Sequence, residues 1–362
     1  MYQIFYALRC NVEVKFKVYE QTIAVVGAGH WGKNLIRNFD EIGALRSICD
    51  TDEKTLESYK YLNSKPRLSK NYQEVIDDKL IDAIAIAVPA EAHYSLAKDA
   101  LLSGKDVFVE KPFCLELEQA QELLELADKL GRIVMVGHLL HYHPCIQTIK
   151  ELLNKNILGN LQYISVHRLN LGKLHTETNV LYSLATHDIS VLLSLCDDLP
   201  YKITCHGGDF TTKGIADTSL LAMSFSNGVE AHIFSSWLNP FKEQKFTLVG
   251  SKGMLVFDDT VPWGEKLLLY PQAVIFDEYG TPDTYPGEAK RVQVEKSEPL
   301  QNECRHFLEC CLSRRKAKTD AEEGLRVMQV LDAAEKSFSS KGMQFIKTDQ
   351  GTYVPRMEKV LF

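Results

Sequence analysis

The chain has 362 residues, 45% of them hydrophobic and 25% charged, a composition typical of a globular protein and unlike that of disordered, fibrous or disulfide-scaffold proteins. Lysine and arginine number 41 against 48 aspartates and glutamates, and the net charge of −7 argues against partners such as nucleic acid or an anionic membrane. A local positive site for one anionic small molecule is still compatible with this charge. At roughly 150 residues per domain, the length predicts two domains, or three small ones.

The nine cysteines show no Cys-x-x-Cys pair, so zinc-type spacing is absent and buried, reduced thiols in a cytoplasmic protein are expected. No apolar run approaches the roughly 18 residues that a membrane span requires. Residues 1–21 lack a signal-peptide core and alternate like a strand. This segment is interpreted as an added edge strand, a disordered leader, or the product of too early a start codon.

Residues 22–144 alternate between predicted strands and helices, which indicates a doubly wound parallel sheet of the Rossmann type, covered by helices on both faces. We expect strands at 22–26, 44–49, 83–88, 107–109 and 133–136, and helices from 32 to about 39 and at 53–62, 72–76, 92–102 and 115–130.

Residues 145–362 follow a different rhythm, in which the predicted strands from 201 to 270 follow one another with no helices between them. This predicts a second domain for substrate binding and oligomerisation, with an open, mostly antiparallel sheet flanked by helices. Strands are expected at 161–169, 201–206, 219–225, 229–235, 246–249, 254–257 and 266–270, helices at 145–154, 180–195, 299–312 and 321–338, and a surface loop at 277–287.

A glycine-rich turn, Gly27-x-Gly29-x-x-Gly32, lies directly between the first strand and the first helix. The first glycine allows the tight turn, the second lets the backbone approach a pyrophosphate, and the third lets helix and strand pack closely. Asp50 ends the second strand, where a carboxylate accepts hydrogen bonds from both ribose hydroxyls and repels a 2′-phosphate. The pattern predicts NAD, with NADP the less favoured cofactor, against the plain alternative of a turn without a ligand.

Lys111 stands in Glu110-Lys111-Pro112 at the carboxyl end of a parallel strand, where open α/β sheets bind ligands. The bond before Pro112 is a candidate for cis geometry. A partly desolvated lysine there can hydrogen-bond a substrate hydroxyl and shuttle its proton. The plain alternative is a solvent-facing lysine in a surface turn.

These motifs together resemble the Gfo/Idh/MocA oxidoreductases, which include glucose–fructose oxidoreductase, inositol dehydrogenases and sugar-nucleotide dehydrogenases. The resemblance extends from about residue 22 to the end of the chain. It is carried by residues 25–32, Val88-Pro89 with His93, Gly104-Lys105 with Val107, Glu110-Lys111-Pro112, and Gly137-His138 with Tyr142 and Pro144, although His141 stands where the family usually has arginine. It implies a cofactor site of Gly27, Gly29, His30, Trp31, Gly32, Asp50, Pro89, His93, Glu110 and Lys111.

In the second domain, His187 matches the histidine that the family uses as the base that takes the hydroxyl proton. The family has an aspartate four residues earlier, whereas this chain has Ser183, and positions i and i+4 share a helix face. Serine can hydrogen-bond a sugar hydroxyl but cannot raise the basicity of His187 by charge, so the proton relay is in doubt. The alternative is a histidine satisfied in an apolar core.

The remaining polar candidates are less specific. His138, His141 and His143 are expected to line the nicotinamide and substrate end of the crevice, and no metal site is predicted. The substrate-binding residues are predicted to be Tyr142, Arg168, Asn170, Ser183 and His187, with Lys173 as a further candidate. For Arg168, Asn170 and Lys173 the alternative is a group of solvated side chains beyond a strand end.

The leading prediction is an NAD-dependent oxidoreductase that transfers hydride between the nicotinamide and a hydroxyl or ketone of a sugar or sugar nucleotide. Lys111 and His187 are its predicted catalytic residues. Residues 163–188 resemble most the members that oxidise the 3-hydroxyl of UDP-N-acetylhexosamines. The alternative, favoured by Ser183, is a non-catalytic NAD-binding sensor or scaffold. A homo-oligomer, dimer or tetramer, is expected through the open sheet face.

Overall fold

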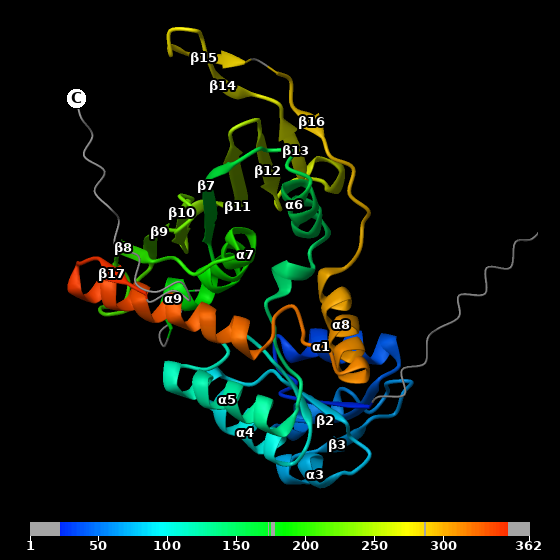
Figure 1. Ribbon diagram of the computed structural model, residues 1–362. Helices are drawn as coiled ribbons and strands as arrows, with labels where there is room; N and C mark the ends of the chain where they lie inside the picture. Colours follow the sequence, from blue (N-terminus) through cyan, green and yellow to red (C-terminus); the bar gives the residue numbers. More distant parts are fainter. Residues whose placement is uncertain (1–21, 173, 175–177, 286, 347–362) are drawn as a thin grey trace, which may run out of the picture.

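The computed structural model describes residues 22–172, 174, 178–285 and 287–346. The segment interpreted as an edge strand or a leader, residues 1–21, therefore lies outside the described residues, as does Lys173. Two sheets dominate the architecture, and helices cover and join them (Figure 1). Both predicted fold classes are confirmed.

The first sheet has six parallel strands in the order β3-β2-β1-β4-β5-β6. The order reverses between β1 and β4, and ligands of open α/β sheets bind at the carboxyl ends of such a pair. The elements are β1 Ile23–Val26, α1 Gly32–Ile42, β2 Leu45–Cys49, α2 Glu53–Glu57, β3 Arg67–Ser69, α3 Tyr72–Asp77, β4 Ala83–Ile86, α4 His93–Leu102, β5 Asp106–Val109, α5 Leu117–Leu130 and β6 Val134–Val136.

Two details of this domain differ from the sequence prediction. The helix expected at 53–62 ends at Glu57, because the following turns use bonds three residues apart, such as Tyr59 N–H to the Leu56 carbonyl at 3.0 Å. Strand β3 was not predicted, since it has three residues of which only Leu68 is apolar. It exists because it pairs with β2, which lends it a hydrogen-bond ladder.

The second sheet has nine strands in the order β16-β13-β12-β11-β7-β10-β9-β8-β17, all antiparallel neighbours except β7 and β10. Its elements, with the helices between them, are α6 Pro144–Asn154, β7 Leu161–Leu171, α7 Thr186–Cys196, β8 Lys202–Gly208, β9 Thr218–Ser224, β10 Glu230–Ser236, β11 Leu238–Gly250, β12 Met254–Asp258, β13 Leu267–Tyr270, β16 Lys290–Arg291, α8 Pro299–Ser313, α9 Ala321–Ser340 and β17 Gln344–Phe345.

Three expectations for this domain need correction. The loop predicted at 277–287 contains a strand, because β14 (Ala273–Phe276) and β15 (Pro282–Tyr285) form a hairpin that projects from the sheet (Figure 1). Strand β11 begins eight residues earlier than the predicted 246, and its pairing with β7 shifts register between Leu238 and Glu243, which accommodates Pro240. The helix predicted at 180–195 opens with a π-helical turn, Leu181–Ala185, before α7.

The last two helices return to the first domain. Phe307 of α8 packs edge-on against Phe108 of β5, with ring centroids 5.7 Å apart. After α8, Arg314 pairs with Asp106 at the start of β5, and the Thr319 carbonyl accepts a backbone hydrogen bond from Val136 N–H at the end of β6. Helix α9 then runs from this junction along the second sheet, beside β8 (Figure 1). Although α8 belongs to the predicted second domain, it covers one face of the first sheet.

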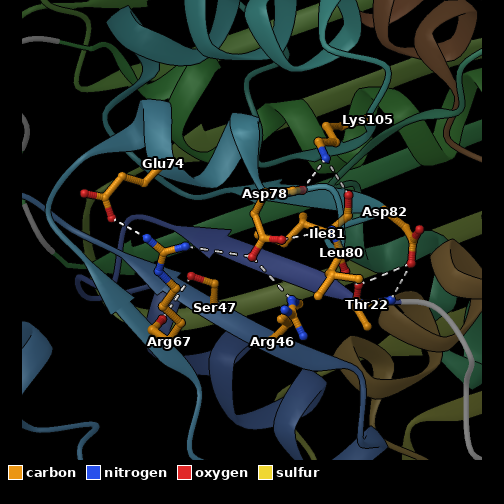
Figure 2. A network of polar contacts seen from close by, with 10 residues as sticks. All are labelled: Thr22, Arg46, Ser47, Arg67, Glu74, Asp78, Leu80, Ile81, Asp82 and Lys105. Carbon is orange, nitrogen blue, oxygen red and sulfur yellow. Dashed lines mark hydrogen bonds and ion pairs between the residues drawn. The ribbon is translucent and has the colours of Figure 1, made fainter.

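A polar network joins the amino-terminal ends of the strands of the first sheet, opposite their carboxyl ends (Figure 2). Lys105 is 5% exposed, and its ammonium donates to the carbonyls of Asp78 and Ile81 at 2.7 and 2.6 Å. The Asp78 carboxylate pairs with Arg46 at 3.4 Å and with Arg67 at 4.0 Å. The lysine of the Gly104-Lys105 motif therefore has a structural role in positioning β4 and β5, far from the strand ends where the ligand pocket lies.

Candidate functional site

The glycine turn after β1 is shaped by two different constraints. Gly27 has a φ of +90°, and a Cβ there would lie 2.5 Å from the Ala87 carbonyl oxygen. A Cβ on Gly32 would lie 1.9 Å from the Gly27 carbonyl oxygen. At Gly29, by contrast, an added Cβ meets no described atom within 4 Å. The fold therefore requires Gly27 and Gly32, whereas Gly29 leaves open space at the surface of the turn.

That open space belongs to a pocket of about 410 Å³ at the carboxyl ends of β1, β2 and β4. The Asp50 carboxylate stands at its edge and accepts hydrogen bonds from the backbone N–H groups of Ala28 at 2.7 Å and Asp52 at 2.9 Å. Each oxygen keeps a lone pair for a ribose hydroxyl. The lining residues are Val26, Gly27, Gly29, Cys49, Asp50, Thr51, Lys70, Tyr72, Ala87, Val88, Pro89, Ala92 and Leu96. The pocket, with the accepting Asp50 carboxylate at its edge, fits the adenosine half of a dinucleotide.

Lys70 is a cation in this pocket that was not predicted from the sequence. It follows β3, lines the pocket beside Asp50, and its ammonium lies 3.3 Å from a Glu53 carboxylate oxygen. No cation follows Asp50 in sequence, but one reaches the same pocket from the next strand. The distance of 20 residues between Asp50 and Lys70 hides their proximity.

The turn after β5 places Lys111. The Lys111–Pro112 peptide bond is cis, as predicted. The buried His93 lies between two loops, with its ring nitrogens 2.7 Å from the Pro112 carbonyl oxygen and 2.9 Å from that of Val88. Among the predicted cofactor residues, His93 therefore clamps the turn of Pro89 to that of Lys111 rather than lining the pocket, and burial lowers the pKa of its imidazole.

Lys111 and His187 lie close together, although they come from different domains. The Lys111 ammonium donates to the Ser183 carbonyl at 3.0 Å, and its charge acts on the His187 imidazole. Burial lowers the pKa of Lys111, and Glu110 partly opposes this shift. Burial, with Lys111 next in effect, lowers the pKa of His187 well below its usual value, which leaves a neutral imidazole able to accept a proton. The structure thus brings both predicted catalytic residues together.

Ser183 differs from its expected setting because it lies in the π-helical turn, where backbone bonds span five residues rather than four. Ser183 and His187 are four residues apart across the junction of this turn with α7, and their shared helix face stays a prediction. The Ser183 hydroxyl oxygen is buried and has no hydrogen-bond partner in the described part of the chain. Such π turns are frequent at functional sites.

The other predicted substrate residues, those besides Ser183 and His187, lie in different parts of the structure. Arg168 and Asn170 lie within β7, not beyond its end, and alternation along a strand puts them on one face. Arg168 forms a two-pronged ion pair with the fully buried Asp188, with Nε 3.0 Å from Oδ2. Tyr142 is 3% exposed, and its hydroxyl contacts Thr319 at 3.3 Å, so it is not brought into the group of Lys111 and His187.

The glycine loop also reaches a buried carboxyl. His30 and Trp31 are exposed, and the Trp31 indole donates to Glu110, the residue before Lys111. Burial raises the pKa of Glu110 to about 7. The charge of Glu110 acts on Glu303 of α8, and both Glu303 oxygens are buried without a partner among the described residues. Burial and Glu110 raise the pKa of Glu303 well above its usual value.

Three partners at this site were missed by sequence reasoning: Asp188, Glu303 and Glu323. Asp188 follows His187 directly in sequence, and Glu323 lies in the first turn of α9, where an acidic residue is favourable without any partner. Glu323 in fact holds His138, whose Nδ1 lies 2.6 Å from Oε2. A signal existed for Asp188 and Glu323, since a buried carboxylate on a helix implies a buried cation or donor.

Over the described residues, no group of three or more His, Cys, Asp or Glu side chains is arranged to hold a metal ion. The eight cysteines that the structure describes are all free and buried. No helix of the described segments is both long and apolar enough to span a membrane.

The fold and the pocket define a dinucleotide-binding protein of the Rossmann type with a second, mostly antiparallel domain. Comparison with known families agrees: residues 21–138 match the NAD-binding Rossmann domain of the GFO/IDH/MocA oxidoreductase family, and residues 146–256 match a C-terminal domain of the same family. The chain belongs to this family of oxidoreductases, so the resemblance noted in the sequence is confirmed.

The relatives differ in substrate. A UDP-N-acetylglucosamine 3-dehydrogenase of Acidithiobacillus ferrooxidans is 27% identical over 216 residues, 59% of this chain and 66% of that one. Its crystal structure superposes with a TM-score of 0.77 at 22% identity, covering 88% and 97% of the two chains. A scyllo-inositol dehydrogenase of Lactobacillus casei, solved with NAD(H) and scyllo-inositol, gives a TM-score of 0.74 at 17% identity over 90% and 98%. At these identities the structures establish the shared fold.

Proposed function

We propose that the protein is an NAD-dependent dehydrogenase or reductase that acts on a secondary hydroxyl or ketone of a sugar or sugar nucleotide. The observation that carries this proposal is that Lys111, after β5, binds the Ser183 carbonyl and acts by its charge on the neutral His187 of α7. NAD bound in the pocket supplies the hydride acceptor. The chain supplies the proton chemistry and the positioning of the substrate.

The proton chemistry follows from the state of the two side chains. Burial lowers the pKa of Lys111, and in its protonated form the ammonium can donate a hydrogen bond to the substrate oxygen and stabilise negative charge there as the C–H bond breaks. His187 is neutral and can take the hydroxyl proton. Arg168 adds little free charge, because Asp188 neutralises it.

For the substrate class we favour a nucleotide sugar, and within that class oxidation at the 3-position of a UDP-N-acetylhexosamine. Two observations support this choice: residues 163–188 resemble such enzymes, and one sequence relative bears the name UDP-N-acetylglucosamine 3-dehydrogenase. The test is mass spectrometry of ligands retained by the purified protein, followed by a panel of sugar nucleotides and polyols monitored by NADH absorbance.

The cofactor choice rests on Asp50. A carboxylate at the ribose edge favours NAD and repels the 2′-phosphate of NADP. Lys70 in the same pocket works in the other direction, although Glu53 partly neutralises it. We therefore keep NAD as the proposed cofactor, with a preference smaller than Asp50 alone would give.

Assembly and location complete the proposal. The face of the second sheet that α9 does not cover exposes Tyr163, Leu220 and Phe234. Apolar residues on an open sheet face favour a homo-oligomer, dimer or tetramer, with this face as the interface. Buried free cysteines fit the reducing conditions of the cytoplasm.

Ser183 supports a second candidate, a non-catalytic NAD-binding sensor or scaffold, because the family places an aspartate there. The two candidates make different predictions for the panel. A dehydrogenase reduces NAD with at least one compound, and the variants Lys111→Met and His187→Gln lose that activity while they keep NAD binding. A sensor binds NAD and shows no turnover with any compound.

A further inference from the structure

Buried polar side chains lead away from the proposed catalytic pair. His138 follows β6, is 1% exposed, and places its Nδ1 2.6 Å from Oε2 of Glu323 in the first turn of α9. The other Glu323 oxygen accepts a hydrogen bond from the Ser190 hydroxyl of α7. The Ser190 oxygen in turn lies 2.7 Å from Nε2 of His141.

The hydrogen bonds in this row of side chains all run toward Glu323. Burial alone would raise the pKa of Glu323, but His138 and the hydrogen bonds lower it below its usual value, so the group is a carboxylate that only accepts. Burial lowers the pKa of His141 to about 4, which leaves it neutral, with its Nδ1 3.4 Å from the Lys150 ammonium. His141 therefore donates from Nε2, and His138 donates from Nδ1, since the Glu323 carboxylate has no proton to give; the neutral form of His138 has its acceptor at Nε2.

The free edge of His138 faces away from Glu323, and its ring meets that of His187. The two ring centroids are 6.4 Å apart, and the rings are inclined at 83°. The Nε2 atom of His138 and the Nδ1 atom of His187 are both buried, and neither has a hydrogen-bond partner among the groups that the structure describes. Unpaired buried nitrogens are costly in a folded protein and require an explanation. Because neither nitrogen bonds the other, a bridging water would pair both and could pass a proton between them.

Glu323, at the far end of this row of hydrogen-bonded side chains, reaches a second pocket. The Glu323 side chain is 13% exposed, against 1% for that of His138, and it lines a pocket of about 280 Å³ with Lys318, Asp320 and Arg326. None of these residues lines the pocket at the glycine turn. A proton that arrives at Glu323 therefore has a route to water that does not pass the cofactor or the substrate.

We propose that His187, His138 and Glu323 form a proton relay that carries the proton of the oxidised hydroxyl out of the site. The proposal rests on the proposed dehydrogenase function. The hydroxyl proton moves to Nε2 of His187, the Nδ1 proton of His187 moves over a bridging water to His138 Nε2, the Nδ1 proton of His138 moves to the Glu323 carboxylate, and Glu323 releases it to water. The hydride leaves with its electron pair to NAD, so oxidation yields ketone, NADH and one proton.

A relay explains how this site works without the family's aspartate. With Ser183 at that position, His187 has no adjacent carboxylate, and Glu323 supplies the negative charge one imidazole further away. The charged or titratable groups that face the two imidazoles are Lys111 after β5, Arg168 of β7 with its partner Asp188, His141 before α6, and Glu323. Glu323 is the acidic group among them that touches solvent.

Glu323→Gln is the sharpest perturbation, because the amide oxygen still accepts the His138 hydrogen bond but cannot take a proton. We expect kcat to fall by roughly 10²-fold, the lower end of what acid–base groups contribute, with little change in the KM of substrate or NAD. His138→Gln should lose about as much, and the double variant should lose no more than either single variant, because the residues act in series. Glu323→Ala should recover activity when acetate is added.

Glu322→Gln is the matched control, since Glu322 lines the same pocket but pairs with Lys316 at the surface. It should retain wild-type kcat and pH profile, and NAD binding and thermal unfolding should be checked for every variant. Wild-type kcat and pH profile in Glu323→Gln, or additive losses in the double variant, would overturn the relay alone. If the wild-type protein oxidises or reduces no compound, the proposed function fails and the relay fails with it.

Discussion

Replacement of Gly29 by alanine separates what the fold needs from what the cofactor needs. An added Cβ meets no described atom within 4 Å, and Gly29 does not have a positive φ, so alanine should leave stability unchanged or raise it by about 0.4–1 kcal/mol through the unfolded state. The same Cβ projects into the open space where a pyrophosphate would approach the backbone. Loss of one hydrogen bond to a charged group costs about 1.5–3 kcal/mol. The affinity for NAD should therefore fall by roughly 10- to 150-fold.

Calorimetric titration with NAD and thermal unfolding measure the two effects on one sample. Gly32→Ala is the matched control, because its Cβ would lie 1.9 Å from the Gly27 carbonyl oxygen and the backbone must move. Gly32→Ala should lower the melting temperature, whereas Gly29→Ala should not. NAD affinity equal to wild type in a stable Gly29→Ala protein would refute the placement of the pyrophosphate at this turn.

Four further predictions use the same site and the outer sheet face. Calorimetry should show tighter binding of NAD(H) than of NADP(H) because of Asp50, and Lys70→Met should widen the difference; equal affinities would refute the assignment. Ser183→Asp should shift the titration of His187 to higher pH, since an adjacent carboxylate favours the protonated imidazole, and pH–rate profiles should reveal it. Because folding raises the pKa of Glu303, the stability that this group contributes is fully present below about pH 4.3 and is lost as pH rises. Glu303→Gln removes this titration and should flatten the fall of the unfolding free energy toward neutral pH. Light scattering should detect an oligomer, and a purely monomeric species at micromolar concentration would contradict the interface on the open sheet.

Much of the cofactor half of the site could be predicted from sequence because it is local. The turn from Gly27 to Gly32 lies between one strand and one helix, and its glycines have steric reasons that spacing alone conveys. Lys111 follows directly from a strand end. In each case strand, turn and functional residue lie within a few positions of one another, so the pattern carries both structure and role.

The substrate half could not be predicted in this way, because its partners are distant in sequence. Glu323 lies 185 residues from His138, and Asp188 lies 20 residues from Arg168 on a different element. The π-helical turn that carries Ser183 was not foreseen either, because its backbone bonds are not written in the spacing of apolar residues. Only the tertiary structure brings these groups together.

The junction before α9 explains why they meet. The Val136 N–H donates to the Thr319 carbonyl at 2.7 Å, and the Thr319 hydroxyl donates to the Val136 carbonyl at 2.8 Å, so the end of β6 is fixed to the start of α9. His138 follows Val136 by two residues and Glu323 follows Thr319 by four, so the same pairing sets the distance between imidazole and carboxylate. Because β6 belongs to the first domain and α9 covers the second, this contact also fixes the first domain relative to the helix that carries the carboxylate. The hydrogen-bond pair that joins the domains therefore positions the proposed proton path as well.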